Sequence, residues 1–322
     1  MLDAFTDKAV NNAGVPFFGL SDHELFHTAV DANISFSLQS QTLISSSSIP
    51  TAEAREMDAY QRSENINLAV AQLPCTLGNK AENIGKMKHV LENQVADLYI
   101  FPELFLTGYL LRDEIFRLSE TLDGPSFQAI TALAKQHQAN ILFGAPVLEE
   151  TAGLIKNSAL IAYADGSIDK YDKIHPANFG PFEEGLYFAP GEDLKIIEVN
   201  GYRFGLLICY DLFFSELSRS YALQGVDGLI CLSASPITSR SSFETVLPAR
   251  AVENALYVVY ANQVGSQSNQ LFFGGSEVRD PSGTALVKNA YFNSEVASAS
   301  LSKSKLANAR RMRPTVRDFF SL

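Results

Sequence analysis

The segment YRFGLLICYDLFFSE, residues 202–216, decides how the rest of the chain is interpreted. The apolar run Phe204–Ile208 predicts a buried strand that ends at Cys209, and a helix is predicted from Leu212. A thiol at such a strand-to-helix turn lies near a helix N-terminus, where backbone N–H groups and the helix dipole favour a thiolate and a nearby oxyanion. Free cysteines are also among the most buried residue types, so this segment alone is equally consistent with a structural role for Cys209 in the core.

Strand and helix patterns alternate on both sides of this segment. They predict strands over residues 66–73, 97–103, 140–147, 227–235 and 257–263, and helices over residues 79–95, 126–138, 212–223 and 243–254. The dipeptides Asp165-Gly166 and Asn200-Gly201 predict tight hairpins, and a last hairpin is expected to turn at residues 281–283. Because tight hairpins require antiparallel neighbours, the pattern predicts an α/β fold in which helices cover mixed sheets.

The two ends of the chain differ from this regular part. Residues 1–63 contain a serine run at 45–48 and no sustained strand or helix period, so we expect a partly ordered N-terminal extension. One domain is predicted over residues 64–305, and a basic tail over residues 306–322 that could contact another subunit. His23 and His27 have a spacing that suits metal ligation, but no carboxylate or cysteine is clustered beside them, so a solvated or packing role is favoured.

The composition argues against several classes of function. The 322 residues carry a formal net charge of −11, which argues against a surface for nucleic acid or an anionic membrane. Cys75, Cys209 and Cys231 are widely spaced, which fits neither a disulfide framework nor a CxxC metal site and suggests a reducing compartment. No apolar run reaches the roughly 18–20 residues of a membrane span, and the N-terminus does not resemble a signal peptide, so we expect a cytoplasmic location.

Two other predicted strands end in residues that suit amide chemistry together with Cys209. Glu103 follows an apolar strand in FPELFLTGY, and desolvation there can raise the pKa of the carboxyl group, as a general base requires. Lys173 in KYDKIHP follows a hairpin strand, where an ammonium group can stabilise an oxyanion and depress the pKa of the thiol. A capping or surface role stays open for both. His175 offers a Cys–His pairing, although the sequence marks no partner for its imidazole.

The segments FPELFLTGY, YDKIHP and LLICYDLFFSEL, in this order, resemble the Glu–Lys–Cys signature of the nitrilase superfamily of carbon–nitrogen hydrolases. The resemblance covers about residues 66–301. The segments at 182–191 and 261–283 also resemble the glutaminase domain of glutamine-dependent NAD synthetase. However, CYDLFF matches the amidase branches, and because the chain ends at Leu322 we expect no synthetase domain. A stand-alone amidase is therefore favoured.

This resemblance implies a four-layer αββα sandwich and a homodimer or larger homo-oligomer. It implies that Cys209 is the nucleophile, Glu103 the general base and Lys173 the group that stabilises the tetrahedral intermediate. Glu184 matches a second glutamate that positions the substrate or its leaving amine. Because Glu183 is adjacent, the sequence does not decide which of the two has this role. The implied substrate is a small-molecule amide, and the reaction needs neither a metal nor an organic cofactor.

Three more residues are candidates for substrate binding. Tyr109 matches a pocket tyrosine of the glutaminase branch, with a role in the core equally open. The backbone N–H of Tyr210 is a candidate oxyanion donor. Arg240 follows the predicted strand end at residue 235 and could bind a substrate carboxylate through two hydrogen bonds, although a loop or interface role is at least as well supported.

The sequence is compatible with three functions. The first is an amidase that acts on a small linear amide or carbamoyl amide through a thioester on Cys209. The second is a glutaminase-like subunit that supplies ammonia to a separate synthase. The third is a catalytically silent member of the family that serves as an interaction scaffold. Nitrile hydrolysis is disfavoured, because many nitrilases carry Trp after the cysteine, where this chain has Tyr210.

Overall fold

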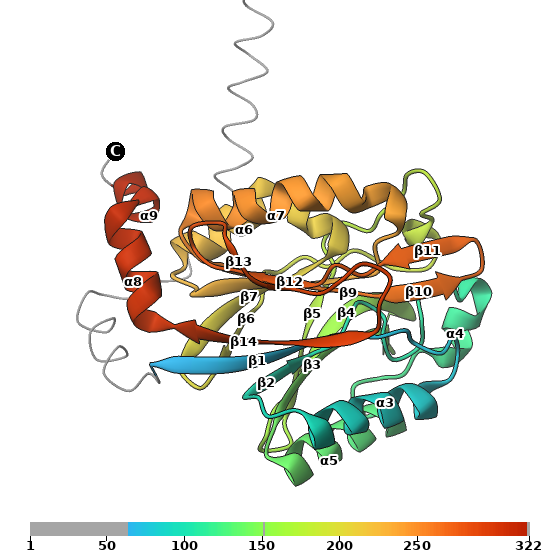
Figure 1. The fold of residues 1–322 in the computed structure, drawn as a ribbon. Coiled ribbons are helices and arrows are strands. Elements are labelled where there is room, and N and C mark those ends of the chain that lie inside the picture. Colours follow the sequence, from blue (N-terminus) through green and yellow to red (C-terminus); the bar gives the residue numbers. More distant parts are fainter. Residues whose placement is uncertain (1–63, 151, 321–322) are drawn as a thin grey trace, which may run out of the picture. The chain divides into compact units, whose positions relative to one another are not determined.

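The computed structural model describes residues 64–150 and 152–320 (Figure 1). The predicted extension over residues 1–63, which includes His23 and His27, lies outside the described residues. The helices among the described residues all lack the length and apolar character of a membrane span. The strands form two six-stranded sheets and one two-stranded hairpin.

The first sheet has the strand order β14-β1-β2-β3-β4-β5. Strands β1, β2 and β3 pair in parallel because α3 and α5 carry the chain back between them, and the remaining pairs are antiparallel. The chain leaves β2 toward Glu103 and leaves β5 at Lys173. The elements are β1 (Asn65–Gln72), α3 (Lys80–Asn93), β2 (Leu98–Ile100), α5 (Pro125–His137), β3 (Asn140–Glu149), β4 (Leu154–Ala162), β5 (Ile168–Asp172) and β14 (Glu295–Ser302).

The second sheet has the strand order β13-β12-β9-β8-β7-β6. Its central strands β7, β8 and β9 are parallel and are connected through α6 and α7. Cys209 directly follows β7, and Ser233 ends β8. The elements are β6 (Ile196–Val199), β7 (Tyr202–Ile208), α6 (Ser215–Leu223), β8 (Gly228–Ser233), α7 (Arg240–Asn254), β9 (Tyr257–Asn262), β12 (Glu277–Arg279) and β13 (Ala285–Lys288).

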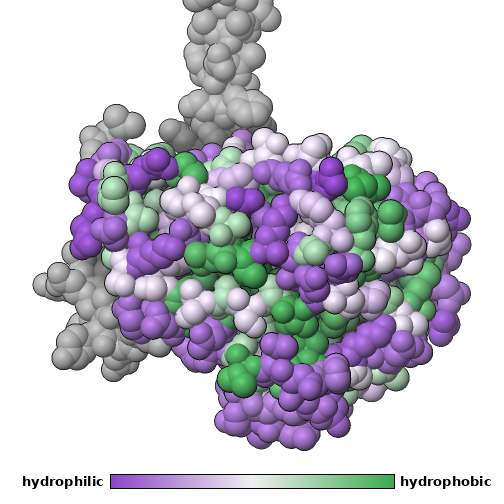
Figure 2. All heavy atoms as spheres, viewed as in Figure 1, coloured by the Kyte–Doolittle hydropathy of each residue, from purple (hydrophilic) through white to green (hydrophobic). Residues whose placement is uncertain are grey.

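The two sheets pack face to face, and helices cover their outer faces (Figure 1). One buried cluster joins Val70 and Ile100 of the first sheet to Leu206 and Ile230 of the second. A second cluster, which includes Met87, lies between the first sheet and helices α3 and α5. On the face drawn in Figure 2, hydrophobic residues gather across the middle and hydrophilic residues dominate the lower end, where α3 and α5 lie. This arrangement confirms the implied αββα sandwich.

All three predicted hairpins are confirmed. Asp165-Gly166 lies in the turn between β4 and β5, and residues 281–283 lie in the turn between β12 and β13. Asn200 and Gly201 connect β6 to β7 with φ angles of 48° and 73°. Asparagine and glycine adopt such positive angles more readily than other residues, which explains why this dipeptide is a reliable hairpin signal.

Two predicted helix starts are wrong. A 3-10 turn, η3 (Cys209–Phe213), follows β7, so α6 begins at Ser215 rather than at Leu212. The apolar residues of this turn are spaced like the buried face of a helix, which explains the error. Helix α7 begins at Arg240, three residues before the predicted start, and Arg240 therefore lies in a first helical turn rather than in a loop.

Several elements were not predicted. Antiparallel β10 (Val264–Gln267) and β11 (Gln270–Phe273) form the separate hairpin. The predicted tail begins within α8 (Lys303–Met312) and continues into α9 (Thr315–Phe319), and its contact with another subunit stays a prediction. The remaining short elements are η1 (Arg112–Glu114), α4 (Ile115–Leu118), η2 (Glu184–Leu186) and η4 (Ile237–Ser239).

Candidate active site

Glu103 lies in a buried polar cluster just beyond β2. Its Oε1 accepts hydrogen bonds of 2.8 Å from Lys173 Nζ and from Asn157 Nδ2, and its Oε2 accepts one of 2.8 Å from the N–H of Ala234. The side chain is fully buried, and this burial raises the pKa of Glu103 above its ordinary value although Lys173 opposes the shift. The carboxyl group is therefore suited to take up a proton and return it.

A glycine in β3 permits this position of Glu103. A Cβ on Gly144 would lie 2.2 Å from Leu104 N and 2.6 Å from Glu103 Cα. The N–H of Gly144 donates to Pro102 O at 3.1 Å, and its carbonyl accepts from Leu106 N at 3.1 Å, so the backbone beyond β2 lies directly against β3. Gly144 is a positioning residue that sequence reasoning missed, because a lone glycine in an apolar strand is an unspecific signal.

Lys173 connects Glu103 to a second glutamate. Its side chain is only 1% exposed, and its Nζ lies 2.8 Å from Glu103 Oε1 and 2.8 Å from both carboxylate oxygens of Glu184. Burial acts to lower the pKa of Lys173, but the carboxylates of Glu103 and Glu184 outweigh it and hold this pKa well above its usual value. Lys173 therefore stays positively charged near neutral pH and can offset negative charge that develops beside it.

The structure brings Glu184 into this cluster and leaves Glu183 exposed. Glu184 Oε1 accepts a 2.5 Å hydrogen bond from Tyr109 OH, and its Oε2 accepts one of 3.1 Å from the N–H of Ala177. The geometry therefore favours Glu184 over Glu183 as the second glutamate, with Tyr109 beside it. The roles of Glu184 and Tyr109 in substrate binding stay predictions.

Cys209 has a φ of 48°, which is uncommon for a residue with a side chain. It starts a 3-10 turn, and because α6 begins only at Ser215, it does not lie at the N-terminus of an α-helix as expected. Burial and then the Glu103 carboxylate raise the pKa of the Cys209 thiol to about 12, which outweighs the lowering by Lys173. Lys173 thus lowers the thiol pKa as expected, but burial and the Glu103 carboxylate have the larger effect.

Asp211 fixes the turn that follows Cys209. Its Oδ2 accepts from the N–H of Ile208 at 3.1 Å and from Tyr171 OH at 2.8 Å. Its Oδ1 accepts from the N–H of His175 at 2.8 Å and lies 3.1 Å from His175 Nδ1. The imidazole partner that the sequence did not mark is therefore Asp211, and the Cys–His pairing is not observed among the described residues.

A row of aromatic rings flanks the polar cluster. Ring centroids lie 6.2 Å apart for Tyr109 and Phe182, 5.3 Å for Phe182 and Phe179, and 4.8 Å for Phe179 and Tyr210. The row thus runs from Tyr109 to Tyr210, the residue after Cys209, and adds apolar surface to a site that otherwise consists of charged groups. The oxyanion role of the Tyr210 N–H stays a prediction.

Arg240 lies outside the polar cluster. Its side chain is 42% exposed, its Nε lies 3.9 Å from Glu244 Oε1, and its Cζ lies 5.1 Å from the ring centroid of Tyr291. In the described ranges, no hydrogen bond or ion pair joins Arg240 to Glu103, Lys173 or Cys209. Its role in binding a substrate carboxylate stays a prediction.

The other two cysteines do not join the cluster. Cys231 is buried in the core, and Cys75 Sγ lies 3.2 Å from Gln263 Oε1 and accepts a 3.0 Å hydrogen bond from Gln267 Nε2. All three cysteines are free thiols. Among residues 64–150 and 152–320, no three His, Cys, Asp or Glu side chains are grouped so that they could hold a metal ion.

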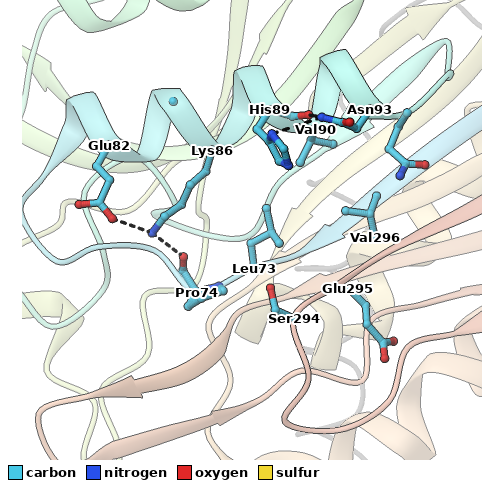
Figure 3. Close-up of a pocket in the computed structure, with 12 residues that line it drawn as sticks. Leu73, Pro74, Glu82, Lys86, His89, Val90, Asn93, Ser294, Glu295 and Val296 are labelled. Atoms are coloured by element: carbon cyan, nitrogen blue, oxygen red, sulfur yellow. Dashed lines mark hydrogen bonds and ion pairs between the residues drawn. The ribbon is translucent and has the colours of Figure 1, made fainter.

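A cavity of about 720 Å³ lies elsewhere, between α3 and the start of β14 (Figure 3). Leu73, Val90 and Val296 supply apolar side chains to its lining, and Lys86 on its wall donates to Pro74 O at 3.0 Å. None of the residues of the polar cluster lines this cavity. It is therefore separate from the candidate active site.

Comparisons with known proteins show which family this chain belongs to. The model of the carbon–nitrogen hydrolase family matches residues 67–311. The 2-oxoglutaramate amidase of Bacillus subtilis is 31% identical over 227 residues, which cover 69% of this chain and 85% of the amidase. The glutamine-dependent NAD(+) synthetase of Thermotoga maritima is 31% identical over 246 residues, which cover 74% of this chain and 42% of the synthetase.

One solved structure is of a CN-hydrolase superfamily protein from Xanthomonas campestris with an arsenic adduct in its active site. It is similar with a TM-score of 0.73 and 29% identity, and the match covers 80% of this chain and 97% of that chain. These findings confirm the resemblance to the nitrilase superfamily, to amidases and to the glutaminase domain of NAD synthetase. The chain therefore belongs to the carbon–nitrogen hydrolase family of enzymes.

Proposed function

We propose that this enzyme hydrolyses the C–N bond of a small linear amide through a thioester on Cys209. The observation that carries the proposal is the buried cluster, in which the Lys173 ammonium lies 2.8 Å from Glu103 and 2.8 Å from Glu184. Burial and then the carboxylates of Glu103 and Glu184 raise the pKa of the Cys209 thiol, whereas the Lys173 ammonium lowers it. The similarity to a 2-oxoglutaramate amidase supports an amide as the substrate.

In the first half of the proposed reaction, Cys209 becomes acylated. Glu103 takes the thiol proton while the sulfur attacks the amide carbon and forms a C–S bond. Lys173 and the Tyr210 N–H stabilise the oxyanion of the tetrahedral intermediate. Glu103 then gives its proton to the nitrogen, the C–N bond breaks, and ammonia or an amine leaves with Glu184 and Tyr109 beside it.

In the second half, water releases the acyl group. Glu103 takes a proton from the water, whose oxygen attacks the thioester carbon. The C–S bond breaks, the proton on Glu103 returns to the sulfur, and a carboxylic acid leaves. One carboxyl group thus serves as acid and base in turn, which suits a group whose pKa is raised by burial.

Replacement of Cys209 tests this proposal directly. Cys209→Ala is expected to lower ammonia release from a responsive amide by about 10⁴-fold or more, as removal of a catalytic nucleophile does elsewhere. Circular dichroism and thermal unfolding should show an intact fold. Unchanged turnover in this variant would refute the mechanism, and failure of Cys209 to react with a thiol-directed probe would favour the catalytically silent scaffold.

A second candidate function is a glutaminase-like subunit that supplies ammonia to a separate synthase. It is favoured by the similarity to the NAD(+) synthetase and by the hydrogen bond between Tyr109, the tyrosine matched to the glutaminase branch, and Glu184. Slow glutamine hydrolysis that rises when a synthase partner is added would support this candidate. High activity on amides without any partner would favour the stand-alone amidase.

We also propose a homodimer or larger homo-oligomer in which the tail over residues 306–322 contacts another subunit. Its support is the exposure of Met312, Phe319 and Phe320, which are 80%, 43% and 52% exposed. Light scattering of the full chain and of a triple Met312, Phe319 and Phe320 alanine variant tests this assembly. The cytoplasmic location stays a proposal that fractionation of expressing cells would test.

A further inference from the structure

The carboxyl end of β8 contacts both the proposed nucleophile and the proposed base. Strand β8 pairs in parallel with β7, so the residues that follow it emerge beside Cys209. The N–H of Ala234 donates to Glu103 Oε2 at 2.8 Å, and Ser235 Oγ lies 3.4 Å from Cys209 Sγ. One short segment therefore sets the relative position of the carboxylate and the thiol.

Ser235 is fixed in place by the side chain of Asn262. Asn262 Oδ1 accepts a hydrogen bond of 2.8 Å from the N–H of Ser235, and Asn262 Nδ2 donates to Ser235 O at 3.3 Å and to Gly274 O at 2.9 Å. Ser235 is 1% exposed. Because both backbone groups of Ser235 are bound in this way, its hydroxyl is held at a defined position beside the sulfur.

A second hydroxyl group extends this contact. Ser233 Oγ lies 2.6 Å from Ser235 Oγ, and both side chains are buried. Burial and then the Glu103 carboxylate raise the pKa of the Cys209 thiol to about 12, whereas Lys173 and the Ser233 hydroxyl lower it. In such an environment, a hydrogen-bond donor directed at the sulfur stabilises the negative charge that develops when the proton leaves.

We propose that Ser235 is a positioning residue whose hydroxyl donates a hydrogen bond to the Cys209 sulfur as the thiol loses its proton. The inference rests on the proposed function, in which Cys209 is the nucleophile. Ser233 donates to Ser235, and Ser235 donates to the sulfur, so both serines keep their protons. The proton of Cys209 goes to Glu103, and no other bond forms or breaks in this step.

The rate of Cys209 alkylation by iodoacetamide tests the inference when it is followed by peptide mass spectrometry across a pH series. Ser235→Ala is expected to displace the pH–rate profile upward by about one pH unit, because a hydrogen bond to a charged group contributes on this scale. At pH values below the pKa of the thiol, this displacement makes the rate about tenfold lower. Ser233→Ala is expected to displace the profile in the same direction by a smaller amount, so that the alkylation rate falls about threefold.

Ser126→Ala is the matched control. Ser126 is also buried and its Oγ donates a 2.6 Å hydrogen bond to Glu120 Oε1, but it lies in α5, and among the described residues it has no hydrogen bond to Cys209, Ser235 or Asn262. Its profile should match that of the wild type. An unshifted profile for folded Ser235→Ala overturns the inference, as does an equal shift in Ser126→Ala. If Ser235→Ala does not fold, an unshifted Ser233→Ala profile overturns it.

The same experiment separates this inference from the proposed function. If no amide is turned over by the wild type but Ser235→Ala still shows the displaced alkylation profile, the amidase proposal fails and the inference is supported. If turnover is present and is abolished by Cys209→Ala while the Ser235→Ala profile is unshifted, the inference fails and the amidase proposal stands.

Discussion

The Lys173 ammonium lies 2.8 Å from the Glu103 carboxylate, and these side chains are 1% and 0% exposed. Glu184 contacts the same ammonium at 2.8 Å, so two carboxylates share one cation inside the protein. Removal of one partner from a buried ion pair leaves a charge that has lost both water and its counterion. This relationship therefore affects both stability and catalysis.

Lys173→Met tests the cluster through its cation. We expect the free energy of unfolding to fall by about 3–5 kcal/mol, because two buried carboxylates lose their counterion. We expect kcat/KM for an amide to fall by about 10²–10³-fold, as for the loss of an oxyanion donor. The matched control is Lys170→Met in β5, because Lys170 forms more exposed ion pairs with Asp172 and Glu149. Its loss should lower the free energy of unfolding by about 1 kcal/mol or less. Equal losses of stability in the two variants would contradict this account.

The pH dependence of kcat/KM tests the raised pKa of Glu103. The base must be deprotonated, so activity should be lost as the pH falls through this pKa, which lies above that of an ordinary glutamate. The pKa of Lys173 is held well above its usual value, so the cation should cause no matching loss near neutral pH. An acid limb at the pKa of an exposed glutamate, or full activity in Glu103→Gln, would refute this role.

Gly144→Ala tests the close approach between β3 and the backbone that carries Glu103. A Cβ would lie 2.2 Å from Leu104 N, so the segment after β2 must move. We expect kcat to fall by about 10²-fold, because a displacement near 1 Å can cost that much. Thermal unfolding should show that the free energy of unfolding falls by about 1–3 kcal/mol. Gly85→Ala is the control, since its Cβ would meet nothing within 4 Å in α3 and should stabilise the helix by about 0.5–1 kcal/mol.

Asp211→Asn tests the support of the turn at Cys209. The variant directs an NH₂ group at either Ile208 N–H or His175 N–H, both of which now donate to the carboxylate. A buried donor without an acceptor should lower the free energy of unfolding by about 1–3 kcal/mol. Cys209 should also be displaced and kcat reduced. Asp165→Asn in the exposed β4–β5 turn should have little effect, and a kcat for Asp211→Asn equal to that of the wild type would contradict the positioning role.

Local turn chemistry explains why much of the fold was predictable. Asn200-Gly201 and Asp165-Gly166 are two-residue signals whose conformational preference does not depend on distant parts of the chain. The start of the helix after Cys209 was not predictable in this way. The left-handed conformation of Cys209 is stabilised by Asp211, and Asp211 is bound to Tyr171, which lies 40 positions earlier in the chain.

The same distinction applies to the candidate active site. Glu103, Lys173 and Cys209 each occur in a characteristic segment, so the sequence singled them out. Their supporting contacts join distant segments. The N–H of Ala234, for example, donates to Glu103 across 131 positions of the chain. Ser233 and Ser235 also stand at a predicted strand end, where sites commonly gather, but only the structure shows that the Ser235 hydroxyl lies beside Cys209.

The central claim is that an acyl group is transferred to Cys209. The most direct test is peptide mass spectrometry of the enzyme after acid quench during turnover of a small linear amide. We expect a mass increase equal to the acyl group on the peptide that contains Cys209, and none in Cys209→Ala. Turnover without an adduct on Cys209, together with activity retained in Cys209→Ala, would contradict the account.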